Sequence, residues 1–114
     1  MPFIDTKTTK TISKEQEKEL TRAFGEAITL IRGKSEEWLM LNFAGNCRMA
    51  FRGTSDEDSA FLEVKIFGKA SKNEYSALTE KLCDIISSVL GVSPGRTYVK
   101  YEEVDTWGYN GFNF

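Results

Sequence analysis

The chain has 114 residues, of which 40% are hydrophobic and 28% charged, and its formal net charge is -2. A chain of this length fits one domain that buries roughly two thirds of its unfolded surface, so it needs no disulfide or metal to fold. The nearly balanced charge gives no reason to expect nucleic acid as a partner. Because there is no apolar run near ~20 residues and no basic-then-apolar start, we expect no membrane span, no signal peptide and a cytoplasmic location.

The side-chain inventory restricts the chemistry further. There is no histidine, and the only cysteines are Cys47 and Cys83. This excludes a Ser-His or Cys-His relay and a zinc site. A general base would be a carboxylate, a lysine, a tyrosine or a terminal amine, and we expect neither a metal nor an organic cofactor.

Pro2 follows Met1 and opens the apolar stretch Phe3-Ile4, which is typical of a strand. If Met1 is removed, the chain begins with a secondary amine. A free α-amino group titrates near ~7.7 to 8.0, and burial disfavours its charged form, so a buried terminal proline is a candidate neutral base. The alternative is a proline that only begins a strand, and a retained Met1 would turn the nitrogen into an amide.

Two helices are expected next, at matching places in two halves of the chain. Ser13 with Gln16, and Ser71 with Glu74, have the spacing of a capping box at a helix start. The apolar faces at three-and-four spacing are Leu20, Phe24, Ala27, Ile28 and Ile31 in the first helix, and Leu78, Leu82, Ile85, Ile86 and Val89 in the second. The glycines expected to end the helices are Gly33 and Gly91.

A second strand follows each predicted helix, over 38–43 and 96–101. A short strand over 48–52 and a polar turn over 53–58 are expected between the halves. The sequence therefore predicts one domain over 1–114, with pseudo-repeats at about 2–59 and 60–114. Its fold class is α+β (an α/β sandwich): a duplicated βαβ unit forming a four-stranded mixed sheet with two helices on one face.

Such a sheet leaves one face and two edges to be covered by something else. The final segment, 107–114, is too rich in aromatic residues for a solvated end. We therefore expect self-association in a closed ring, with this segment packed on a neighbouring subunit.

Several motifs carry a family resemblance along the whole chain. They are Met1-Pro2, Gly33-Lys34, Met49-Ala50-Phe51 followed by Gly53 and Ser55, Gly68-Lys69, Arg96-Thr97-Tyr98-Val99, and Trp107-Gly108-Tyr109-Asn110-Gly111. In order and spacing they resemble the macrophage migration inhibitory factor family of the tautomerase superfamily. The resemblance implies a homotrimer with sites at the subunit interfaces. The activity it implies is keto–enol tautomerisation of phenylpyruvate-like α-keto acids.

The resemblance also implies roles for single residues. Pro2 corresponds to the proline that moves the proton, and Lys34 to the lysine that holds the substrate carboxylate. Phe67, with Ile66 as the alternative, takes the place where a backbone amide meets the substrate. Tyr98 corresponds to a tyrosine lent by a neighbouring subunit. The apolar wall around the substrate ring corresponds to Trp107, Tyr109 and Phe114.

Two lysines carry alternative interpretations. Lys34 also suits a cation near a helix C-terminus, where it would favour the helix dipole. Lys100 stands where the family commonly has asparagine, two residues beyond Tyr98, and positions two apart on a strand face the same side. An added cation near the pocket would lower the pKa of the Pro2 amine and favour an anionic substrate. The alternative for Lys100 is a solvated lysine on a sheet edge.

Two further functions stay open. Members of the resembled family also act as secreted signalling proteins, so the chain is alternatively a receptor-binding protein, secreted without a leader, that meets a host receptor and has incidental or vestigial tautomerase activity. The third interpretation is a trimeric scaffold with a vestigial pocket, since Lys100 would have altered the site.

Overall fold

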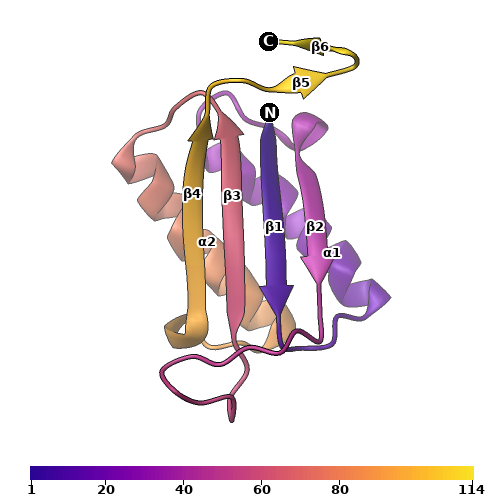
Figure 1. The fold of residues 1–114 in the computed structure, drawn as a ribbon, viewed down its shortest axis with the longest axis vertical. Coiled ribbons are helices and arrows are strands. Elements are labelled where there is room, and N and C mark those ends of the chain that lie inside the picture. Colours follow the sequence, from indigo (N-terminus) through magenta and orange to yellow (C-terminus); the bar gives the residue numbers. More distant parts are fainter.

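Two strand–helix–strand units make up the sheet in the computed structural model, which describes residues 1–114. The elements are β1 (Pro2–Thr8), α1 (Lys14–Ala27), β2 (Met40–Ala44), β3 (Ala60–Phe67), α2 (Lys72–Leu90) and β4 (Thr97–Val104). The strand order is β2-β1-β3-β4, with β1 and β2 parallel, β3 and β4 parallel, and β1 and β3 antiparallel. Both helices lie on one face, so the predicted α+β class with a mixed four-stranded sheet is confirmed (Figure 1).

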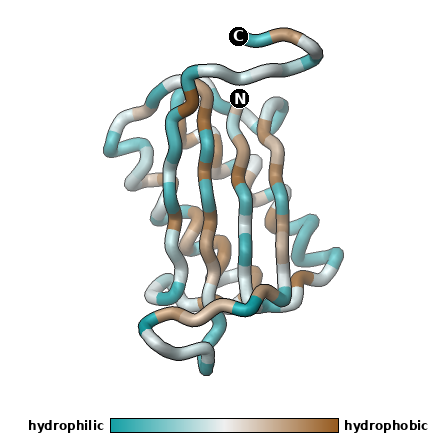
Figure 2. The backbone as a smooth tube through the Cα atoms, in the orientation of Figure 1, coloured by the Kyte–Doolittle hydropathy of each residue, from teal (hydrophilic) through white to brown (hydrophobic).

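The two central strands alternate between the helix face and the open face of the sheet. The even-numbered residues of β1 and β3 are buried, whereas the odd-numbered ones are mostly half-buried. Figure 2 shows the same alternation as hydrophobic and hydrophilic segments along the strands. This period of two places Ile4, Leu62 and Val64 in the core and leaves Asp5 and Lys65 on the open face.

The core lies between the sheet and the helices. The predicted apolar faces of both helices are buried there, except that Val89 is only partly buried. Phe24 of α1 is fully buried and stacks on Phe43 of β2 at a centroid distance of 6.2 Å. Polar residues occupy the outer helix faces, and no helix of the structure is long and apolar enough to cross a membrane.

Both predicted helix starts are confirmed. The Ser13 hydroxyl accepts from the Gln16 amide at 3.1 Å, and the Gln16 side chain accepts from the Ser13 amide at 2.9 Å. Ser71 and Glu74 form the same reciprocal pair at the start of α2. These bonds satisfy amides that have no partner within the helix.

The two helices end differently, which corrects the expectation that Gly33 and Gly91 play the same part. Gly91 caps α2 in the left-handed conformation, at φ 72°. The first helix ends at Ala27 and tightens into a 3-10 turn over Ile28–Leu30, well before Gly33. The Thr29 hydroxyl donates to the Glu26 carbonyl, and local side-chain bonds of this kind compete with the regular helix pattern.

The predicted strand limits also need correction. The strand expected over 38–43 begins at Met40, because Glu36–Trp38 forms a 3-10 turn. The last strand begins at Thr97 and runs to Val104, while Arg96 ends another 3-10 turn. No strand forms over 48–52. Phe51 and Thr54 instead close a tight turn with two mutual hydrogen bonds.

A C-terminal hairpin joins β5 (Gly108–Tyr109) to β6 (Phe112–Asn113) and was not predicted. Its turn residues, Asn110 and Gly111, both have positive φ, as a two-residue hairpin turn of this kind requires. Figure 1 shows the hairpin across the end of the sheet at which the chain begins. The hairpin therefore brings distant aromatic residues to the N-terminus.

Thr6 offers a test of the core. Its side chain is fully buried in β1 and its hydroxyl has no hydrogen-bond partner. Because an unsatisfied buried hydroxyl is costly, Thr6→Val is expected to raise the free energy of unfolding by about 1 kcal/mol. Urea unfolding at an unchanged m-value measures it.

Thr8→Val is the matched control. The Thr8 hydroxyl is equally buried, but it donates to the Ser59 carbonyl at 2.8 Å and accepts from the Lys10 amide at 3.2 Å. This substitution should lower the unfolding midpoint. Equal effects of the two substitutions would contradict the difference in hydrogen bonding.

Candidate active site

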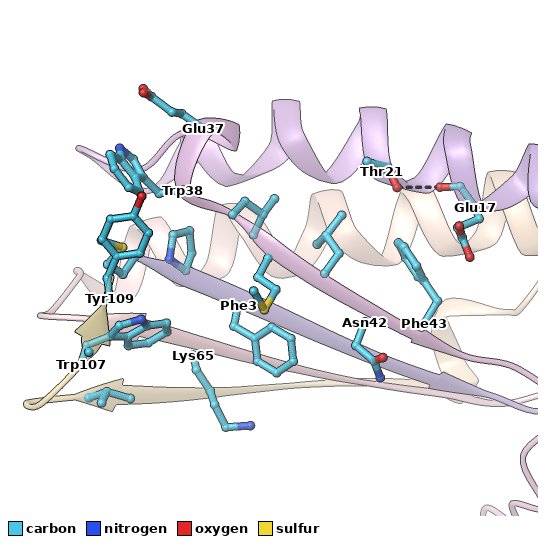
Figure 3. Close-up of a pocket in the computed structure, with 17 residues that line it drawn as sticks. Phe3, Glu17, Thr21, Glu37, Trp38, Asn42, Phe43, Lys65, Trp107 and Tyr109 are labelled. Atoms are coloured by element: carbon cyan, nitrogen blue, oxygen red, sulfur yellow. Dashed lines mark hydrogen bonds between the residues drawn. The ribbon is translucent and has the colours of Figure 1, made fainter. Parts of the chain in front are cut away.

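A groove of about 1110 Å³ runs along the β2 edge of the sheet (Figure 3). It extends from the C-terminal hairpin, past the start of β1, to the first turns of α1. Trp38, Trp107 and Tyr109 gather at the hairpin end, whereas Glu17 and Thr21 lie at the other. Because 10 of its 17 lining residues are hydrophobic, the groove suits a ligand with an apolar body.

Pro2 is buried at the mouth of β1 and lines this groove. It pairs with Ile66 across the antiparallel β1–β3 ladder. Beyond that pair, the Met1 carbonyl accepts a hydrogen bond from the Phe67 amide at 3.0 Å. Met1 thus engages the backbone N–H that the resemblance assigns to substrate binding, and Ile66 and Phe67 both lie beside the amino terminus.

Lys34 reaches the same place from the turn after α1. Its ammonium donates to the Phe67 carbonyl at 2.8 Å. It lies beyond the last helical turn, which contains no basic residue, so the alternative interpretation as a helix-dipole cation is wrong. The position of Lys34 instead places a positive charge beside the start of the chain.

The amino terminus responds to this environment. Burial lowers the pKa of the Met1 amine, and the charge of Lys34 lowers it further. Both influences disfavour the protonated amine. A terminal amine at this end of β1 is therefore held towards its neutral form.

Aromatic side chains of the hairpin enclose the same end of the groove. Tyr109 meets Trp38 edge-on, with ring centroids 5.2 Å apart, and stacks on Phe114 at 6.3 Å. Phe114 also lies 5.7 Å from the ring of Phe67. The predicted wall residues Trp107 and Tyr109 line the groove, whereas Phe114 does not line it and reaches it only through its contact with Tyr109.

Tyr98 lies at the opposite end of the sheet from Pro2. It pairs with Phe61, which pairs with Lys7, whereas Pro2 shares a row with Ile66 and Glu103. Tyr98 and Glu103 are separated by strand positions that rise ~3.3 Å each, or roughly 16 Å in all. Tyr98 therefore does not meet Pro2 of its own chain.

Lys100 lies on the open face with Tyr98, as the strand period predicts, and both are exposed. Its ammonium forms an ion pair with Glu102 at 3.0 Å. Lys65 pairs with Glu63 at 3.1 Å and Lys7 with Asp5 at 2.8 Å on the same face. Most of the positive charge on this face thus has a carboxylate partner, and the acidic residues and cysteines form no group of three or more that could hold a metal ion.

Comparison with known proteins identifies the family. The sequence matches the family described as macrophage migration inhibitory factor (MIF) over residues 1–114. The chain belongs to the macrophage migration inhibitory factor family. The macrophage migration inhibitory factor of Rattus norvegicus is 29% identical over 98 residues, which cover 84% of this chain and 81% of that protein.

Solved structures agree with this membership. The structure of Leishmania major MIF2 has a TM-score of 0.93 at 25% identity and covers 100% of this chain and 97% of its own. A MIF homologue from Prochlorococcus marinus has a TM-score of 0.83 at 25% identity and covers 98% of each chain. The predicted membership of the MIF family, within the tautomerase superfamily, and the predicted fold are confirmed.

Several lining residues of this MIF-family groove were not predicted from the sequence. Trp38 and Met40 line it from the β2 edge, and Phe3, Lys65 and Val104 line it from the open face. Lys65 is placed there by the β1–β3 register, which pairs it with Phe3 and puts its ammonium 5.7 Å from that ring, and the sequence alone does not give this register. The sequence gives no signal that Trp38 lines the groove. The pattern predicts it as the first residue of a strand, whereas it lies in the turn before β2.

Proposed function

We propose that this chain is a cofactor-independent keto–enol tautomerase acting on phenylpyruvate-like α-keto acids, with Pro2 of the processed chain as general base and acid. The observation that carries the proposal is the amino terminus itself. It lies in an apolar groove beside Lys34, where burial and the lysine charge lower the pKa of the terminal amine. Membership of a superfamily of isomerases agrees with this chemistry.

Removal of Met1 would free two groups at once. The Pro2 nitrogen would become a secondary amine, subject to the same burial and the same cation. The Phe67 amide would lose the Met1 carbonyl that now accepts its hydrogen bond. A neutral amine and a free N–H donor would then lie beside the Lys34 ammonium.

The reaction then follows from these groups. Lys34 and the Phe67 amide hold the substrate carboxylate, and Trp107, Tyr109 and Phe114 pack around its aromatic ring. The neutral Pro2 nitrogen takes a proton from the carbon beside the keto group. The electron pair of the broken C–H bond forms the enol double bond while the π pair of the keto group moves to its oxygen. The protonated Pro2 returns the proton to the former keto oxygen. Positioned proton transfer of this kind contributes typically ~10²- to 10⁴-fold.

A second copy of the chain would complete the site. Tyr98 and Pro2 lie at opposite ends of one sheet, so Tyr98 can serve only the groove of a neighbour. This arrangement supports a homotrimer in which each subunit lends its Tyr98. Lys100, on the same strand face, would approach the neighbouring site together with its partner Glu102. The proposed location is the cytoplasm.

The test is keto–enol interconversion of phenylpyruvate, followed by ultraviolet absorbance of the enol. Intact mass selects protein that lacks Met1, and sedimentation equilibrium measures the assembly. Turnover by trimeric, processed protein is expected. Trimers without turnover would contradict the enzyme and favour a scaffold with a vestigial pocket.

A second function has a specific observation in its favour. The curated relatives are named for an effect on macrophage migration. A receptor-binding protein would keep its affinity for animal cells when Pro2 is replaced, and would be found outside intact producing cells. Binding that disappears together with tautomerase activity would contradict a separate receptor surface.

A further inference from the structure

Arg96 is the only charged residue whose side chain is buried in the chain, and no carboxylate pairs with it. Its guanidinium donates to the carbonyls of Phe51 at 3.2 Å, Thr54 at 3.0 Å and Asp58 at 3.2 Å, and to the Ser59 hydroxyl at 3.1 Å. The planar fork of arginine matches several acceptors at once, which the single ammonium of lysine does not. Arg96 therefore holds the long connection between β2 and β3 against the start of β4.

Two of these bonds fix one tight turn. Phe51 and Thr54 bond to each other through their backbone groups, at 2.9 and 3.1 Å, and Arg96 binds the remaining side of both carbonyls. The guanidinium carbon also lies 5.3 Å from the centroid of the Phe51 ring. Arg96 thus contacts Phe51 at two points, its backbone carbonyl and its ring, and both contacts fix the position of the ring.

The Phe51 ring in turn contacts Tyr98. The two rings meet edge-on, with centroids 5.1 Å apart and an interplanar angle of 88°. Phe61 packs edge-on against Tyr98 as well, at 6.1 Å. The Tyr98 hydroxyl makes no hydrogen bond within the chain, and the side chain is 57% exposed. Within the chain, the contacts that hold the Tyr98 side chain are therefore those of its ring.

We infer that Arg96 is a positioning residue that sets the direction of Tyr98 through the ring of Phe51. The consequence for activity rests on the proposed function, in which Tyr98 contacts substrate in a neighbouring groove. An exposed tyrosine without this support would sample several rotamers, and the site would be complete only part of the time. Arg96 would then act on substrate binding without touching the substrate.

The central variant is Arg96→Lys, which keeps the positive charge but loses the fork. We expect KM for phenylpyruvate to rise about fivefold, the size expected from loss of one aromatic contact, while kcat and the pH profile stay unchanged. Phe51→Leu should raise KM by a similar factor. In the Phe51→Leu background, Arg96→Lys should add nothing, because the link it acts through is gone. Arg22→Lys, on the outer face of α1, is the control for loss of an arginine.

A second readout does not depend on activity. The chain has four tyrosines, so 3-fluorotyrosine labelling gives four fluorine resonances, and Tyr98→Phe assigns the one from Tyr98. Arg96→Lys is expected to shift and broaden the Tyr98 resonance while the Tyr75 resonance stays in place. The same substitution should leave Tyr98 unaffected when Phe51 is already leucine.

The outcomes separate the two proposals. A Tyr98 resonance that does not change in Arg96→Lys, or that changes equally with and without the Phe51 ring, overturns the positioning role whatever the enzyme does. A changed resonance in a protein without tautomerase activity supports the positioning role and contradicts the proposed function. Loss of kcat with unchanged KM would also overturn the inference, since it points to general loss of folded enzyme.

Discussion

Pro2→Gly is expected to lower kcat/KM for phenylpyruvate by about 10²- to 10⁴-fold, the contribution typical of a positioned general base. Glycine keeps a small residue after Met1, so the methionine can still be removed. The change replaces a buried secondary amine by a more mobile primary one. The fold should survive, because the substitution removes only one ring at the first position of β1.

The pH profile gives an independent check on the same group. Only the neutral amine accepts a proton, so activity should fall as the pH drops through its pKa. Since burial and Lys34 lower the pKa of an amine at this terminus, the fall should occur below the usual ~7.7 to 8.0. We call the pH at which this fall is half complete the acid limit of activity. An acid limit above that range in processed protein would rule out the proline as base. Full activity in chains that retain Met1 would rule it out as well.

Lys34→Met has the second-largest expected effect. Methionine keeps the length of the side chain and removes its charge, so the substrate carboxylate loses its cationic partner. A hydrogen bond to a charged group is worth about 1.5 to 3 kcal/mol, which predicts a rise in KM of roughly 10- to 150-fold. Removing the cation should also raise the pKa of the terminal amine, so the acid limit of activity should move to higher pH.

Lys18→Met is the matched control for this change. Lys18 is exposed on α1, and its side chain forms no hydrogen bond or ion pair. The Lys18→Met substitution should leave both KM and the pH profile unchanged. If Lys34→Met alters KM without moving the acid limit, Lys34 binds the carboxylate but does not govern the amine.

Much of the architecture could be predicted because it depends on local rules. A serine three residues before a glutamine or glutamate fixes both helix starts, and spacing along one face predicts which helix residues are buried. The strand-helix-strand order then leaves few ways to arrange a four-stranded sheet. These features need only neighbouring residues, so one sequence reveals them.

The parts that could not be predicted depend on contacts between distant segments. Nothing near Trp38 in the sequence shows that the edge strand begins only at Met40. The tight turn at Phe51 is held by Arg96, which comes much later in the chain. The distance between Tyr98 and Pro2 emerges only from the register of three strands. For the same reason, the sequence could not decide whether Lys34 binds a ligand or stabilises the end of the first helix. The decision required the position at which α1 ends.

The hydrogen bond between the Met1 carbonyl and the Phe67 amide has a consequence for any purified sample. If the proposed function holds, a retained Met1 blocks the site in two ways, because it turns the Pro2 nitrogen into an amide and occupies the Phe67 N–H. A partly trimmed preparation would then be a mixture of active and inactive grooves. Its maximal velocity would scale with the trimmed fraction while its apparent affinity stayed constant. The specific activity of a batch would then report how completely the aminopeptidase had removed Met1.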